Sequence, residues 1–316
     1  MSIVPCCALF KRRPGGDAPH RRTREVSVRL ANCRFEGRRR IAISRGETVD
    51  LLHERATDIL ALAADPAGVE AAIDRRGVSI EAIAFDLPVE RPDKILCIGI
   101  NYRDHAAEAS AAAKEPANPS IFVRFPGSHS GHEQPIVAPA ISEQFDFEGE
   151  LGVIIGKPAW RISRSDALSH VAGYCCFAEN SVRDFQKHAT QITAGKNFRS
   201  SGAFGPWLTT ADEVGDPSRL TLVTRLNGAV MQSAALSSMI FPVDALIAYI
   251  SQFTQLLPGD VIATGTPAGV GALRTPPVWM KPGDLLEIDI PGVGLLRNRV
   301  VAEDAIFPEI NEETRS

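Results

Sequence analysis

Residues 146–156 read Asp146-Phe147-Glu148-Gly149-Glu150-Leu151-Gly152-Val153-Ile154-Ile155-Gly156. The run Val153-Ile154-Ile155 predicts a buried strand, because it is short, β-branched and bounded by glycines. Glu148 and Glu150 lie two residues apart, so in an extended chain both side chains point to the same face. Two carboxylates that close raise each other's pKa unless a cation lies between them. Hard divalent ions take such oxygen ligands, so the pair indicates a metal site. A strand edge with two solvated glutamates is the alternative.

The composition is that of a globular protein. The chain has 316 residues, of which 44% are hydrophobic and 23% charged, and its formal net charge of −4 argues against a nucleic-acid partner. No stretch approaches the roughly 20 apolar residues that span a bilayer, so we expect no membrane association. The six cysteines include no CxxC spacing, which predicts reduced thiols in a cytoplasmic protein.

The chain divides into three segments. Residues 1–24 are basic and contain glycine, and we expect them to form a disordered extension. Residues 25–91 predict a small N-terminal domain. The proline-bracketed run Asp86-Leu87-Pro88-Val89-Glu90-Arg91-Pro92 is the predicted boundary, after which residues 92–316 form a larger catalytic domain.

Strands dominate the predicted secondary structure. In the smaller domain, strands at 26–30 and 40–43 precede apolar spacing over 49–75 that predicts a helix broken by Pro66. In the larger domain we expect strands at 94–98, 220–224, 260–263, 285–290 and 293–296, and helices at 103–114, 182–188 and 243–253. Strands and helices do not alternate regularly, so the sequence predicts a mainly β, α+β fold and argues against a Rossmann or barrel fold.

A histidine and a glutamate share one face of the predicted helix at 103–114. Gly99 permits a tight exit from the preceding strand, and the alanine-rich continuation favours a helix. His105 and Glu108 are then at positions i and i+3, close enough to pair. A carboxylate-held histidine is a general-base arrangement, because the acid fixes the tautomer and stabilises the imidazolium. Such pairs also occur on solvated helices, which is the alternative.

More polar side chains surround the predicted helix at 182–188. Glu179 follows an apolar strand, where its carboxylate can enter a site. Arg183 and Gln186, also at i and i+3, offer donors for a substrate carboxylate, and Lys196 adds an amine from a loop. For Arg183 and Lys196 an ordinary surface position is the alternative.

A glycine-rich loop, Thr264-Gly265-Thr266-Pro267-Ala268-Gly269-Val270-Gly271, follows the predicted strand at 260–263. It leads into Arg274-Thr275-Pro276-Pro277 instead of a helix, so a P-loop or dinucleotide site lacks its required context. The loop's backbone donors and the Thr266 hydroxyl are candidates for binding a substrate carboxylate.

Together these segments resemble the fumarylacetoacetate hydrolase family, in the branch of acylpyruvate hydrolases and 2-hydroxyhepta-2,4-diene-1,7-dioate isomerases. The resemblance covers about residues 92–300. The matching segments occur in the family's order and are residues 99–108, 146–151, 181–186, 195–196, 205–207 and 258–271.

The resemblance implies a mixed β-roll catalytic domain, a homodimer and a bound Mg²⁺, Mn²⁺ or Ca²⁺ ion. It assigns the metal ligands to Glu148, Glu150 and Glu179, the last of which stands where relatives usually carry an aspartate. It also implies hydrolysis of a 2,4-dioxo acid of the acylpyruvate type to pyruvate and a carboxylic acid, as in the catabolism of aromatic compounds. The implied catalytic residues are His105, Glu108 and Lys196, and the implied substrate-binding residues are Arg183, Gln186 and Thr266.

Other activities are compatible with the same enolate chemistry. Decarboxylation or tautomerisation of a related 2-oxo acid is the main alternative, and hydratase or lyase activity is more distant. The hydrolase is placed first because both His105 and Glu108 are present. The alternative of another class is a catalytically silent, metal-stabilised binding protein. Such a protein would have little need for a base, three carboxylates and a lysine in one site.

Overall fold

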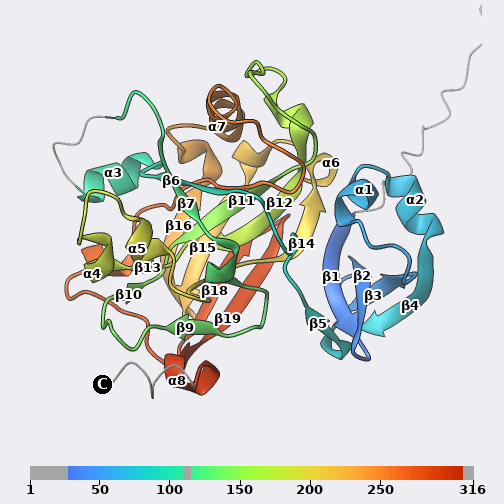
Figure 1. Ribbon diagram of the computed structural model, residues 1–316, viewed down its shortest axis with the longest axis horizontal. Coiled ribbons are helices and arrows are strands. Elements are labelled where there is room, and N and C mark those ends of the chain that lie inside the picture. The colour runs from blue at the N-terminus through green and yellow to red at the C-terminus, as the bar shows by residue number, and fades with distance from the viewer. Residues whose placement is uncertain (1–27, 110–114, 309–316) are drawn as a thin grey trace, which may run out of the picture.

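The structure is a computed structural model that describes residues 28–109 and 115–308. The predicted basic extension, residues 1–24, lies outside these ranges. Strands are the main regular structure of the protein, and the helices are short and lie at its periphery (Figure 1). The prediction of a mainly β fold of the α+β class is therefore confirmed.

A twelve-stranded mixed sheet runs through the whole molecule. Its order is β4-β3-β2-β1-β14-β12-β11-β17-β6-β7, with β5 pairing with β1 and β8 with β14. The strands are β1 (Arg29–Phe35), β2 (Arg38–Ser44), β3 (Thr48–Leu52), β4 (Ile73–Ser79), β5 (Ile83–Phe85), β6 (Ile95–Gly99), β7 (Ser120–Arg124), β8 (His129–Ser130), β11 (Gly149–Ile155), β12 (Val171–Ala178), β14 (Gly202–Thr210) and β17 (Val261–Ala263).

A second, five-stranded sheet has the order β16-β15-β18-β19-β9, and β10 pairs with β13 in a short ribbon. These strands are β9 (Ile136–Ala138), β10 (Phe145–Asp146), β13 (Ser181–Val182), β15 (Thr221–Leu226), β16 (Ala229–Ala235), β18 (Leu285–Ile290) and β19 (Gly294–Ala302).

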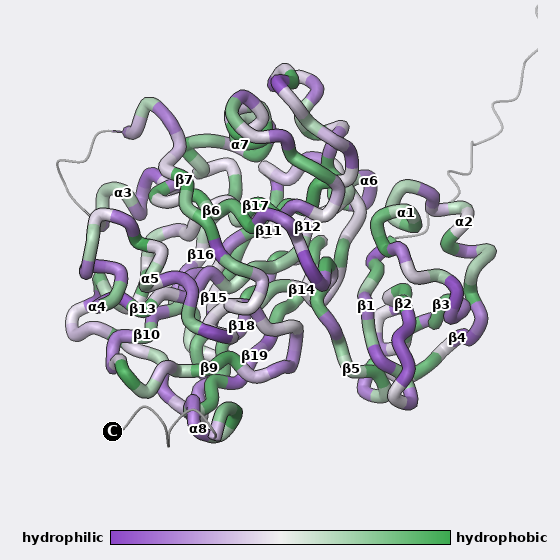
Figure 2. The backbone as a smooth tube through the Cα atoms, in the orientation of Figure 1, coloured by the Kyte–Doolittle hydropathy of each residue, from purple (hydrophilic) through white to green (hydrophobic). Residues whose placement is uncertain are grey.

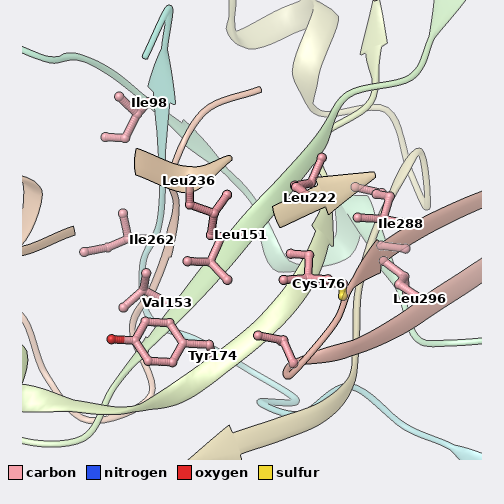
Figure 3. Packing of buried hydrophobic residues seen from close by; sticks show 14 of the residues in the cluster. Ile98, Leu151, Val153, Tyr174, Cys176, Leu222, Leu236, Ile262, Ile288 and Leu296 are labelled. Carbon is pink, nitrogen blue, oxygen red and sulfur yellow. The ribbon is translucent and has the colours of Figure 1, made fainter. Parts of the chain in front are cut away.

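The main hydrophobic core lies between the two sheets. Leu151 of β11 and Cys176 of β12 belong to the same buried cluster as Leu222, Ile288 and Leu296 of the second sheet (Figure 3). Strands β6 and β17, which are covered on both sides, are hydrophobic along their length (Figure 2). This two-layer packing holds β11 and β12 in a fixed register at the centre of the molecule.

The predicted helix over 49–75 is wrong in its first part. Thr48–Leu52 is strand β3, because pairing with β2 buries Val49 and Leu51 in the N-terminal core. Pro66 starts helix α2 (Pro66–Ala71) instead of breaking a longer one, since proline fits the first turn and Asp65 caps it. The remaining helices are α1 (Ile59–Ala63), α3 (Arg103–Ala109), α4 (Arg183–Gln186), α5 (Thr193–Lys196), α6 (Ala211–Val214), α7 (Val243–Ile250) and α8 (Glu303–Ile306).

The N-terminal strands form the lobe on the right of Figure 1 and are joined to the rest by pairing of β1 with β14. The predicted division near residue 91 stays a prediction. No helix in the described part of the chain is long and apolar enough to cross a membrane.

His132 joins the two parts of the molecule. Its Nδ1 accepts a hydrogen bond from the backbone N–H of Arg297 at 3.0 Å, and its ring meets Phe85 of β5 edge-on at 5.0 Å. Burial, together with the nearby positive charge of Arg297, lowers the pKa of His132 from 6.5 to about 4. The folded protein therefore holds this imidazole neutral under conditions in which an unfolded chain protonates it.

This shift predicts acid sensitivity. Because the folded pKa of His132 lies below the unfolded one, its contribution to stability is complete above pH 6.5 and is lost as the pH falls toward 4, by up to roughly 3 kcal/mol. We expect His132→Gln to flatten the fall in the free energy of unfolding over that range, measured by urea denaturation. The variant His53→Gln, at an exposed position, is the control, and equal slopes in both variants would contradict the prediction.

Candidate active site

Three glutamates meet where β11 and β12 lie side by side. Glu150 belongs to β11, Glu148 lies two residues before it, and Glu179 directly follows β12. The backbone N–H of Glu179 donates to the carbonyl of Glu148 at 2.9 Å, which locks the two segments together. One carboxylate oxygen from each of the three residues lies within 4.8 Å of the others. The pairing register thus brings together the three residues expected to be metal ligands.

These carboxylates are buried, and their charges are only partly compensated. Glu148, Glu150 and Glu179 are 5%, 1% and 1% exposed. Burial, followed by the charges of Glu179 and Glu148, raises the pKa of Glu150 well above its usual range. Burial also raises the pKa of Glu179. All three carboxylates can ionise together only if a further cation lies among them. Hard divalent ions prefer oxygen ligands of this kind, so the donor set fits Mg²⁺, Mn²⁺ or Ca²⁺.

Two cations border the glutamates, Lys196 buried and Arg183 largely covered. The Lys196 ammonium donates to Glu148 Oε1 at 3.0 Å and also to Glu179 Oε2. Arg183 lies 2.8 Å from Asp146 Oδ2 and 2.9 Å from Glu148 Oε1. Burial opposes ionisation of Glu148, but Arg183 and Lys196 outweigh it and lower its pKa to about 2. Arg183 and Lys196 are therefore parts of the site and not surface charges.

Arg124 is a third cation beside the glutamates, and the sequence analysis assigned it no role. It ends strand β7, is 2% exposed, and donates from Nη1 to Glu179 Oε1 at 3.1 Å. The sequence feature that could have predicted its role is its place in the apolar run Ile121-Phe122-Val123-Arg124-Phe125. A charged side chain buried in such a strand needs a partner of opposite charge.

The predicted His105–Glu108 pair forms on helix α3. His105 Nδ1 lies 3.1 Å from Glu108 Oε2, and both side chains are mostly buried. Glu108 also accepts from the Gly269 backbone N–H at 3.1 Å. The glycine-rich loop therefore supports the pair, and His105 Nε2 is the ring nitrogen left for a substrate. Gly265 of the same loop donates its N–H to Glu150 Oε2 at 2.7 Å.

A cavity of about 240 Å³ joins these groups. Its polar lining is His105, Glu148, Glu179, Arg183, Gln186, Lys196 and Thr266, and its apolar lining is Ile98, Gly99, Ile100, Phe122 and Ile192, with Ser120 beside them. Its volume is below the roughly 300–1,000 Å³ of pockets for drug-sized ligands, which indicates a small substrate.

Two predicted substrate-binding residues carry internal hydrogen bonds. The Thr266 hydroxyl donates to the Gly149 carbonyl at 3.1 Å and accepts from Gln232 Nε2 at 2.7 Å, so it anchors the glycine between the first two glutamates. A β-carbon at Gly149 would lie 2.0 Å from Thr224 Oγ1, which explains why that position has no side chain. Gln186 Oε1 accepts from Arg183 at 3.0 Å, which leaves its amide N–H groups for a ligand.

Backbone strain also occurs at the cavity. Ile100 has φ of 52°, an unfavourable conformation for a β-branched residue. Buried Asn101 holds it there, because its side chain donates to the carbonyls of Thr264 at 2.7 Å and Phe241 at 2.9 Å. Strain of this kind persists only where the surroundings fix the chain, and it is common at functional sites.

Residues 94–301 match the family described as fumarylacetoacetate (FAA) hydrolase, C-terminal. The fold and the glutamate site thus define a member of the fumarylacetoacetate hydrolase family, and the chain belongs to it.

Two relatives and one solved structure show what the chain is similar to. It is 42% identical over 221 residues to the mitochondrial oxaloacetate tautomerase of Homo sapiens, covering 69% of this chain and 70% of that protein. It is 40% identical over 224 residues to oxaloacetate tautomerase YisK of Bacillus subtilis, covering 70% of this chain and 74% of the other. The fumarylacetoacetate hydrolase structure from Exiguobacterium antarcticum aligns with a TM-score of 0.77 and 31% identity, over 88% of this chain and all of that one.

The cluster predicts the behaviour of an isosteric variant. Glu150→Gln keeps an oxygen that can accept from Gly265 but removes a charge, so we expect Mn²⁺ affinity to fall by about two orders of magnitude with the fold intact. Electron paramagnetic resonance titration of Mn²⁺ measures it. Glu70→Gln, in the N-terminal lobe, is the control. Unchanged Mn²⁺ affinity in Glu150→Gln would exclude Glu150 as a ligand.

Proposed function

We propose that this protein is a metal-dependent keto–enol tautomerase of a small 2-oxo dicarboxylic acid of the oxaloacetate type. The observation that carries the proposal is the 240 Å³ cavity that Glu148, Glu179, Lys196, Arg183 and His105 line together. The tautomerases that match about 70% of the chain at 40–42% identity support the same reaction class. These relatives favour tautomerisation over acylpyruvate hydrolysis, which the sequence analysis ranked first.

The reaction moves one proton and changes no other atom. In the enol-to-keto direction, the enol oxygen loses a proton, C3 gains one, and the C2–C3 double bond becomes the C2–O double bond. A divalent ion held by Glu148, Glu150 and Glu179 would supply Lewis acidity toward the 2-oxo group. Lys196 and the free amide of Gln186 would hold substrate oxygens, and their positive ends would stabilise the negative charge that develops on O2.

His105 would carry the proton at C3. Glu108 engages Nδ1, so Nε2 can give or take a proton on the substrate side. Because Gly269 in turn holds Glu108, the imidazole is positioned before substrate arrives. Apolar Ile100 and Phe122 would limit the access of water to the enolate.

Hydrolysis of a short acylpyruvate is the second candidate, favoured by the same His105–Glu108 pair. The pair would activate a water molecule to attack the 4-carbonyl, the C3–C4 bond would break, and pyruvate and a carboxylic acid would leave. Decarboxylation of oxaloacetate would yield pyruvate and carbon dioxide.

Product analysis distinguishes these reactions. The enol form of oxaloacetate is supplied to the Mg²⁺-loaded protein, its ultraviolet absorbance is followed, and products are identified by nuclear magnetic resonance. Accelerated conversion to the keto form without pyruvate supports tautomerisation. Pyruvate from oxaloacetate would indicate decarboxylation, and pyruvate with a carboxylic acid from an acylpyruvate would indicate hydrolysis. No turnover of either substrate would leave the silent binding protein.

The division of roles gives a further prediction. His105→Ala should lower kcat for tautomerisation by about 10²–10⁴-fold, the range for loss of a general acid–base, because His105 is the residue assigned to carry the C3 proton. Its Mn²⁺ affinity should match that of the unaltered protein, since His105 is not one of the clustered carboxylates. His53→Ala, an exposed histidine in the N-terminal lobe, is the control. Loss of Mn²⁺ binding in His105→Ala would refute this assignment.

A further inference from the structure

We infer that Arg124 is a positioning residue of the metal centre, which orients Glu179 so that a single carboxylate oxygen is presented to the ion. The inference rests on the metal centre of the proposed function but not on the reaction catalysed there. Arg124 does not line the cavity, so it acts on the site through Glu179.

The guanidinium is held in place independently of Glu179. Nη2 donates to Ser201 Oγ at 2.9 Å and to the Ser128 carbonyl at 3.4 Å. Nε donates to Ser128 Oγ at 3.2 Å, and Nη1 reaches the Asn180 carbonyl at 3.1 Å. Three of these four contacts go to Ser128 and Ser201, which are not part of the glutamate cluster, so they hold the guanidinium in place without Glu179.

The attachment leaves Glu179 with two unlike oxygens. Oε1 accepts from Arg124 at 3.1 Å, whereas Oε2 meets Lys196 inside the cluster. The other two glutamates each have one oxygen held by the protein. Oε2 of Glu150 accepts from the Gly265 N–H, and Oε1 of Glu148 accepts from Lys196. Each of the three carboxylates therefore has at least one oxygen tied to the protein, which restricts how it can turn toward an ion.

An arginine suits this position better than a lysine. Its planar fork of five N–H donors serves four separate residues here, and an ammonium has only three donors. Space is also made for the fork, since a β-carbon at Gly202 would lie 2.9 Å from Arg124 Nη2. A salt bridge needed only for charge balance would not require this set of acceptors.

The test is Mn²⁺ affinity in Arg124→Lys, which keeps the charge but loses the fork. We expect the dissociation constant to rise about 10–100-fold, the usual effect of removing a residue that orients a metal ligand, with the circular dichroism spectrum unchanged. Arg40→Lys is the matched control, because Arg40 is also largely covered and binds Leu52 and Asp74 away from the site. Affinity within twofold of the unaltered protein would overturn the inference.

A double-variant cycle shows whether Arg124 acts through Glu179. In a Glu179→Gln background the additional effect of Arg124→Lys should vanish, and an equal effect in both backgrounds would overturn the inference. If Arg124→Lys does not fold, Ser201→Ala removes one anchor without leaving a buried charge, and it should weaken Mn²⁺ binding in the same direction. An unchanged affinity there would overturn the inference. Mn²⁺ binding without tautomerase activity would refute the proposed reaction but leave Arg124 in its role.

Discussion

Three carboxylates, from Glu148, Glu150 and Glu179, lie within 4.8 Å of one another and are almost wholly removed from water. Like charges cannot be buried so closely unless cations accompany them or protons neutralise them. Lys196 and Arg183 meet part of this requirement, and the raised pKa of Glu150 shows that a part remains. The unmet charge makes the cluster a candidate site for a divalent ion.

The sheet architecture creates this concentration of charge. Strands β11 and β12 pair at the centre of the molecule, and their packed register fixes where the glutamates leave the sheet. The short ribbon of β10 and β13 places Asp146 and Arg183 beside them, and the loop after β17 supports Glu150 through Gly265. The same loop holds Glu108, so the His105–Glu108 pair and the carboxylate cluster are supported by one segment.

Local patterns predicted the parts of the site that depend on neighbouring residues. The two-residue spacing of Glu148 and Glu150 and the i, i+3 spacing of His105 and Glu108 both gave the observed neighbours. Contacts between distant segments could not be derived in this way. Arg124 meets Glu179 across 55 residues, and Gly269 meets Glu108 across 161.

The error in the N-terminal lobe has a similar cause. Leu51 and Leu52 have helix-like spacing with later leucines, but pairing of Thr48–Leu52 with β2 and β4 gives them a deeper burial than a helix face would.

The assignment of metal ligands is tested most directly by anomalous diffraction from a crystal soaked in Mn²⁺. We predict a peak within bonding distance of Glu148, Glu150 and Glu179, with all three carboxylates coordinated. Full occupancy of Mn²⁺ elsewhere, with this cluster empty, would contradict the account.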